Sequence, residues 1–234
     1  MHSHLPSQER AGHQFPVFVI SLVNGVSRLT FTLSTLAVLL VVELMINPHF
    51  GALAPEWIDR LGFTPHDLTH LEWERFVTAT LLVDGRSAFV DGIVMIALAV
   101  GAAEWLTGTP RAALTFWGGN LITLLVMSVL LLVLAHAISP SDPERLFVYR
   151  DVGPSAGYYG CLGLVVARLP RPWRWAAAAA ILTWLAVALI TPPGPNTIAD
   201  VKLQADLAHF LVFPLGYLSA RLGHSKASAD AGSL

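Results

Sequence analysis

The sequence has little charge and little cysteine. Only 13% of its 234 residues are charged, and the net charge is −2. Because no basic stripe is present, the charge pattern gives no indication of nucleic-acid binding. The single cysteine, Cys161, excludes an internal disulfide and any metal site that needs several cysteines. No group of His, Asp and Glu residues has the spacing of metal ligands, so we expect no metal and no cofactor.

Long apolar runs, in contrast, are abundant. Hydrophobic residues make up 54% of the chain, and the mean hydropathy is +0.61. A transmembrane helix needs about 20 consecutive apolar residues, and runs of that kind recur along the sequence. We therefore predict an all-α polytopic membrane protein with a bundle of six transmembrane helices. The predicted spans are residues 29–46, 87–106, 112–138, 153–169, 173–190 and 204–220.

The placement of charged residues predicts a cell-membrane protein with both termini in the cytoplasm. In that orientation eight cations lie on the inner side: Arg10, Arg28, Arg111, Arg168, Arg171, Arg174, Arg221 and Lys226. Acidic residues outnumber cations in the outer loops. Three of the arginines lie in one short inner loop, where the positive-inside rule is most reliable.

The chain divides into three predicted regions. Residues 1–28 are expected to form a cytoplasmic segment, in which residues 15–26 could be an interfacial helix. Residues 29–222 form the membrane domain, and its first apolar run is interpreted as a retained signal-anchor. Residues 223–234 are predicted to be a disordered cytoplasmic tail. The outer loop from Asn47 to about Arg86 is long for a helical bundle, and its aromatic residues suit amphipathic segments at the membrane surface.

Gly153-Pro154-Ser155-Ala156-Gly157 opens the fourth predicted span. Proline suits a first helical turn because it has no N–H to leave unsatisfied. Ser155 then lies where free backbone N–H groups and the positive helix end concentrate, a setting that stabilises an oxyanion. The stretch also matches the Gly-x-Ser-x-Gly nucleophile elbow. That motif requires a preceding strand in a parallel sheet, which this sequence does not predict.

His209, in the sixth predicted span, is a candidate base for Ser155. Small residues recur at spacings of three and four along both spans, which lets helices approach closely in a membrane. His209 shares a face with Gly216, so close packing would bring its imidazole toward the Ser155 hydroxyl. Small-residue stripes are also typical of plain packing, and an intramembrane His can be a satisfied core residue. Asp206 could orient His209 or lie at the outer rim.

Four groups of residues follow one another in an informative order. Ahead of the second span stand Trp73, Arg75 and Thr78. At the turn into the third stand Glu104, Gly108 and Arg111. The fourth and sixth spans contribute Gly153, Ser155, Gly160, Gly163, Ala208, His209 and Gly216. In this order and spacing, the chain from about Trp73 to Ala220 resembles the rhomboid family of intramembrane serine proteases.

The resemblance implies a rhomboid-like bundle with a Ser-His dyad. Ser155 would be the catalytic nucleophile and His209 the general base, with no metal or cofactor. The implied reaction is endopeptidase cleavage of transmembrane proteins near the outer membrane boundary. Partners would then be transmembrane substrates or clients and the lipid bilayer, with no nucleic acid.

Departures from the family pattern lead to an alternative. Rhomboids place a His and an Asn in the second helix to help bind the oxyanion. Here those positions fall near Ala88 and Gly92, with Asp91 close by, and an ionised carboxylate would repel an oxyanion. Ala156 and Val212 also stand where rhomboids have glycine. The alternative is a rhomboid-like pseudoprotease that binds membrane-protein helices without cleavage. A transporter or channel is disfavoured because intramembrane ionisable residues are few and no internal repeat is evident.

Overall fold

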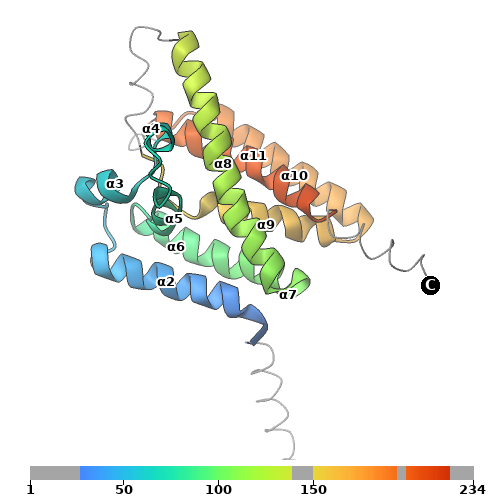
Figure 1. Ribbon diagram of the computed structural model, residues 1–234. Coiled ribbons are helices and arrows are strands. Elements are labelled where there is room, and N and C mark those ends of the chain that lie inside the picture. The colour runs from blue at the N-terminus through green and yellow to red at the C-terminus, as the bar shows by residue number, and fades with distance from the viewer. Residues whose placement is uncertain (1–26, 139–149, 194–198, 222–234) are drawn as a thin grey trace, which may run out of the picture.

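The computed structural model describes residues 27–138, 150–193 and 199–221, and every regular element in these ranges is a helix (Figure 1). The predicted all-α class is therefore confirmed. The predicted interfacial helix at 15–26 and the predicted tail at 223–234 lie outside the described residues. So does nearly all of the N-terminal segment.

Four helical stretches are long and apolar enough to cross a membrane, and they coincide with the first, second, third and fifth predicted spans. They are Ser27–Ile46, Arg86–Thr107, Thr109–Leu131 and Arg171–Ile190. Their outward faces expose large apolar side chains, such as Leu114 at 74% and Ile190 at 81%. Such faces suit a lipid environment, so the structure supports a membrane protein with several spans.

The elements of these four stretches are as follows. The first is the short η1 (Ser27–Leu29) followed by α2 (Thr30–Ile46). The second is α6 (Arg86–Met95), a π-helical turn η2 (Ile96–Val100) and α7 (Gly101–Thr107). The third belongs to α8 (Thr109–Ile138), and the fourth is α10 (Arg171–Ile190).

At the positions of the fourth and sixth predicted spans, the structure has α9 (Ser155–Arg168) and α11 (Ala199–Ser219). In Figure 1, α2 and α6 lie on one side of α9, α10 and α11 lie on the other, and α8 crosses in front. With 14 residues, α9 is about 21 Å long. That is shorter than the roughly 30 Å of a hydrocarbon core. More than half of its residues are buried, and it packs against α7, α8, α10 and α11, so α9 is an interior helix of the bundle.

Glycines bring α9 and α11 into backbone contact. A Cβ atom on Gly216 would lie 1.9 Å from the carbonyl oxygen of Gly160, and one on Gly163 would lie 2.1 Å from that of Phe213. No side chain fits at those distances, so the approach depends on glycine. The predicted close packing of these two helices through small residues is confirmed.

Glu104 joins the first three apolar stretches. Its buried carboxylate accepts hydrogen bonds from the N–H groups of Phe31 (2.9 Å) and Thr32 (2.8 Å), and from the hydroxyls of Thr32 (2.7 Å) and Thr109 (2.6 Å). A carboxylate at a helix N-terminus satisfies otherwise unpaired N–H groups and interacts favourably with the helix dipole. Glu104 of α7 therefore holds the start of α2 and the start of α8 together.

The segment between α2 and α6 contains three short helices: α3 (Pro55–Leu61), α4 (Pro65–Thr69) and α5 (Arg75–Leu81). The buried Asp67 carboxylate organises them. It accepts a hydrogen bond from the Thr64 N–H at 2.7 Å, lies 3.1 Å from Arg150 Nη1 and lies 3.8 Å from Arg75 Nε. The Thr78 hydroxyl donates to the Leu61 carbonyl at 2.8 Å. These contacts hold α3, α4 and α5 against one another.

The same segment also positions the residues that lead into α9. Phe63 and Asp151 exchange two backbone hydrogen bonds, of 3.0 and 2.7 Å. The Gly153 N–H donates to the Ala79 carbonyl at 2.8 Å. The chain just before Ser155 is therefore anchored to Phe63, which precedes α4, and to Ala79 of α5.

Substitution of Gly216 tests the backbone contact. Gly216→Ala puts a Cβ against the Gly160 carbonyl, and we expect it to destabilise the fold by about 1–3 kcal/mol. Gly118→Ala is the matched control, since a Cβ there meets nothing within 4 Å. Thermal unfolding in detergent micelles measures both. An equal Tm for the two variants would contradict the proposed role of the contact.

Candidate active site

A constrained turn places Ser155 at the first position of α9. Gly153 has φ +122°, a conformation that glycine adopts without a steric penalty. Pro154 follows and has no N–H, so it leaves no donor unsatisfied. The Ser155 side chain is partly buried at the start of the helix.

Two backbone donors lie beside the Ser155 hydroxyl. Among the described residues, no acceptor takes the N–H groups of Ser155 and Ala156, while the Gly157 N–H donates to Asn120 Oδ1 at 3.1 Å. Free N–H groups at a helix N-terminus bind anions readily. The start of α9 can therefore stabilise negative charge with its backbone alone.

Asn120 of α8 fixes the depth and orientation of this helix start. Its side chain is 4% exposed, and its Nδ2 donates to the Phe116 carbonyl at 3.1 Å. A Cβ on Gly157 would lie 2.4 Å from that Nδ2 atom, so glycine is required for the contact. Asn120 stands near the middle of the apolar stretch Thr109–Leu131. The sequence shows an amide residue, Asn120, within an apolar run. Only the packing of the helices shows that its partner is the Gly157 N–H.

His209 lies against the second turn of α9. Its ring centroid is 4.2 Å from that of Tyr159, with 31° between the ring planes. Its Nε2 atom is buried and has no hydrogen-bond partner among the residues that the structure describes. Tyr159 follows Ser155 by one helical turn, so His209 and Ser155 lie at neighbouring levels of the α9–α11 interface. No hydrogen bond joins the Ser155 hydroxyl to His209 in this structure.

Tyr159 is the site residue that sequence reasoning missed. It is buried and packs between His209 on α11 and Trp184 on α10. Its position one turn after Ser155 is visible in the sequence, but an aromatic ring at that position is equally typical of plain packing. Only the arrangement of three helices makes it a support for the imidazole.

Asp206, the candidate to orient His209, has a different partner. Its carboxylate forms an ion pair with Lys202, one turn earlier on α11. Lys202 also donates to the Ala188 carbonyl at 2.6 Å. The pair joins α11 to the end of α10, and no hydrogen bond connects Asp206 with His209.

The cavity at Ser155 is small. It has a volume of about 20 Å³, room for roughly one water molecule. Asn120, Thr123, Ala205 and Ala208 are among the residues that line it with Ser155. Substrate access therefore requires some separation of the surrounding helices.

The second span approaches the same turn without offering a donor. A Cβ on Gly92 would lie 4.0 Å from the Pro154 ring, so Gly92 faces the start of α9. The side chain of Asp91, next to it, is exposed. The described residues also contain no group of three or more His, Cys, Asp or Glu side chains suited to a metal ion. An oxyanion at Ser155 would depend on the backbone donors of α9.

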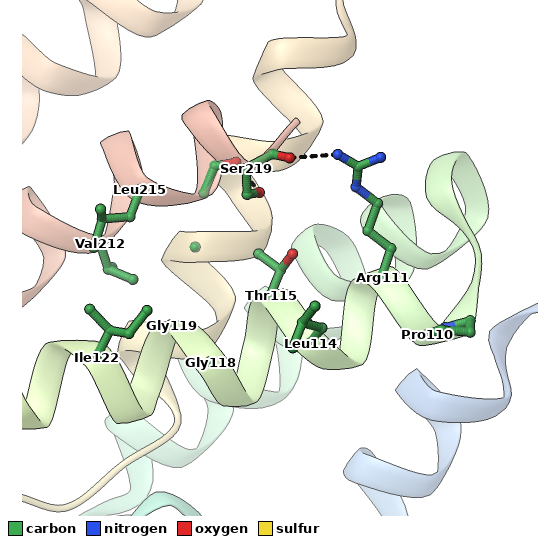
Figure 2. A pocket seen from close by; sticks show the side chains of 12 residues that line it. Pro110, Arg111, Leu114, Thr115, Gly118, Gly119, Ile122, Val212, Leu215 and Ser219 are labelled. Atoms are coloured by element: carbon green, nitrogen blue, oxygen red, sulfur yellow. Dashed lines mark hydrogen bonds between the residues drawn. The ribbon is translucent and has the colours of Figure 1, made fainter. Parts of the chain in front are cut away.

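A larger apolar groove of about 620 Å³ lies between α8 and α11 (Figure 2). Leu114 and Ile122 line it from α8, and Val212 and Leu215 line it from α11. Arg111 closes one end by donating to the Ser219 carbonyl. Its polar lining residues are Arg111, Thr115 and Ser219, and none of the described residues that line it is a histidine or a carboxylate that could act as a general base.

Val212, one of the departures from the resemblance described above, is fully buried. Its Cγ2 atom would lie 3.2 Å from a Cβ on Gly119 and 3.3 Å from a Cβ on Gly160. The absence of side chains at those two glycines leaves room for the valine. The backbone contact between α9 and α11 therefore forms with Val212 in place.

Asn120 and Thr123 provide a matched pair of substitutions next to Ser155. Asn120→Ala leaves the buried Gly157 N–H without an acceptor, and we expect a loss of about 1–3 kcal/mol in unfolding free energy. Thr123→Val removes a buried hydroxyl that has no partner, so little change is expected. Thermal unfolding of both variants in one detergent checks this, and a Thr123→Val loss as large as that of Asn120→Ala would refute it.

Comparison with protein-family models, with curated proteins and with solved structures finds no match to this chain. We therefore infer a function from the geometry of the site.

Proposed function

We propose that this protein is a rhomboid-like intramembrane serine protease with a Ser155–His209 dyad. One observation carries the proposal. The His209 Nε2 atom is buried without a partner, on a ring held by Tyr159 one turn after Ser155. A buried imidazole nitrogen without a partner lowers the stability of the fold. A role as the base that takes the proton of the Ser155 hydroxyl would explain why the protein keeps such a nitrogen.

The proposed mechanism uses groups already on the α9–α11 interface. The Ser155 hydroxyl attacks the carbonyl carbon of the scissile peptide bond while His209 Nε2 takes its proton. The resulting oxyanion accepts hydrogen bonds from the N–H groups of Ser155 and Ala156. His209 then donates the proton to the leaving amine, and the acyl-enzyme ester is hydrolysed by water. Catalytic hydrogen bonds often shorten only when substrate is bound, so we expect the dyad to close in the complex.

The proposed membrane arrangement adds α9 and α11 to the four apolar stretches, giving six spans with both termini in the cytoplasm. The contact between Asn120 and the first turn of α9 supports a position for Ser155 within the membrane, below the end of α8. Water would enter from the outer side. The substrates would be transmembrane proteins cleaved near the outer boundary.

A pseudoprotease that binds helices without cleaving them is the second candidate. It is favoured by the lack of a hydrogen bond between Ser155 and His209, by the small cavity at Ser155, and by the absence of a side-chain donor at Gly92. In that function α9 and its neighbours would serve only as a surface for partner helices.

Active-site labelling distinguishes the two. For a protease, we expect a fluorophosphonate to label the purified protein and a model transmembrane substrate to be cleaved in liposomes. Ser155→Ala and His209→Ala should each lower cleavage by about 10⁴-fold or more, since the members of a catalytic dyad act as a unit. Ser219→Ala and His66→Ala change the same residue types away from the site and should leave the rate unchanged. Labelling that persists in Ser155→Ala would exclude this serine as the nucleophile.

The pseudoprotease makes the opposite prediction for the same variant. Ser155→Ala should then capture a transmembrane partner as well as the unchanged protein does, measured by co-purification from a membrane that contains both. Removal of a large apolar side chain from the exposed side of α11, as in Leu218→Ala, should weaken capture. Cleavage by the unchanged protein that Ser155→Ala eliminates would overturn this second candidate.

A further inference from the structure

A basic cavity lies at the end of α9 that is remote from Ser155. It has a volume of about 350 Å³ and forms where α9 and α11 end and α10 begins. Its lining residues are Ala167, Arg168, Leu169, Arg174, Tyr217, Ala220 and Arg221. The 13 residues from Ser155 to Arg168 place it about 20 Å from the candidate dyad.

Three hydrogen-bond donors at this cavity are buried and unused. Arg168 Nε, Arg174 Nε and the Tyr217 hydroxyl have no hydrogen-bond partner in the described ranges 27–138, 150–193 and 199–221. Tyr217 is only 9% exposed. Buried polar groups in folded proteins nearly always have a partner. Three unsatisfied donors around one cavity therefore indicate a ligand that accepts hydrogen bonds.

The charged residues around the cavity indicate whether that ligand is positive or negative. Among the described residues, three arginines line it and no carboxylate does. Within the described part of the chain, none of these arginines forms an ion pair. An acceptor that also neutralises positive charge is an anion.

Aromatic residues place the cavity at a membrane surface. Trp173 and Trp175 are more than half exposed at the start of α10. The Arg174 guanidinium lies 5.4 Å from the Trp175 ring centroid, and that ring lies 6.1 Å from the ring of Tyr217. Exposed tryptophans beside arginines are typical of the headgroup level of a bilayer.

We propose that this cavity is a binding site for a phosphate-bearing anion, with an anionic phospholipid headgroup as the source that its membrane level favours. Guanidinium groups match the oxygens of a phosphate in geometry and charge. Basic pockets between transmembrane helices bind anionic headgroups in this way. Arg168 and Arg174 hold the phosphate oxygens and the Tyr217 hydroxyl donates a further hydrogen bond. The site does not depend on catalysis at Ser155.

Lipid binding to the full chain tests the site. The protein is reconstituted in nanodiscs of phosphatidylcholine with a minor fraction of phosphatidylglycerol, and co-purifying lipid is measured by native mass spectrometry after transfer to detergent. We expect phosphatidylglycerol to be enriched over phosphatidylcholine. Arg168→Gln and Arg174→Gln should each lower its retention about tenfold, the usual loss for one charge-assisted hydrogen bond. Tyr217→Phe keeps the ring and should give a smaller loss.

The controls separate a specific site from general attraction. Arg171→Gln removes the same charge three residues from both Arg168 and Arg174, and Arg171 does not line the cavity. It should therefore retain the lipid, as should Ser155→Ala.

In a second arm, inorganic phosphate is titrated into detergent-solubilised protein while tryptophan fluorescence is followed. A saturable change lost in Arg168→Gln, without enrichment of phosphatidylglycerol, would support the anion site with a soluble source. Absence of both signals, or equal losses in Arg171→Gln and Arg168→Gln, would overturn the proposal.

Discussion

The backbone contact between α9 and α11 is the constraint on which the rest of the structure depends. Gly216 against the Gly160 carbonyl, and Gly163 against that of Phe213, bring two helices closer than any side chain permits. In a bilayer such contact is favoured by packing, since lipid provides no hydrophobic drive between helices. The contact also fixes which turn of α11 lies opposite which turn of α9, and so places His209 beside Tyr159.

The two ends of α9 present opposite chemistry. At its start, free N–H groups, Ser155 and an unpaired imidazole nitrogen suit a reaction that develops negative charge on oxygen. At its end, arginines and a buried tyrosine hydroxyl surround a cavity suited to a permanent anion. Because α9 has only 14 residues and is about 21 Å long, its two ends lie closer together than the two faces of a hydrocarbon layer.

The sequence indicates candidate site residues, but it does not indicate which side chains contact them. Ser155 and His209 stand out because a serine at a glycine-rich helix start and an intramembrane histidine are unusual in lipid-facing segments. Asp206, three residues before His209, was a candidate to orient the imidazole, yet it pairs with Lys202, four residues earlier on α11. Tyr159 and Asn120, which hold the imidazole and the helix start, act across helices. Such contacts depend on how each helix is rotated about its own axis relative to its neighbours. The spacing of residues within one helix does not determine that rotation.

The sequence by itself determined the all-α class, the four strongly apolar stretches and the glycine faces of two further helices, because hydropathy and residue size act locally. The tertiary structure decided the rest. It alone showed that Val212 fits in the place of a glycine, since the space comes from Gly119 on a third helix. It alone gathered Arg168, Arg174 and Tyr217 around one cavity, because those residues lie on three helices whose ends meet only when the bundle is packed.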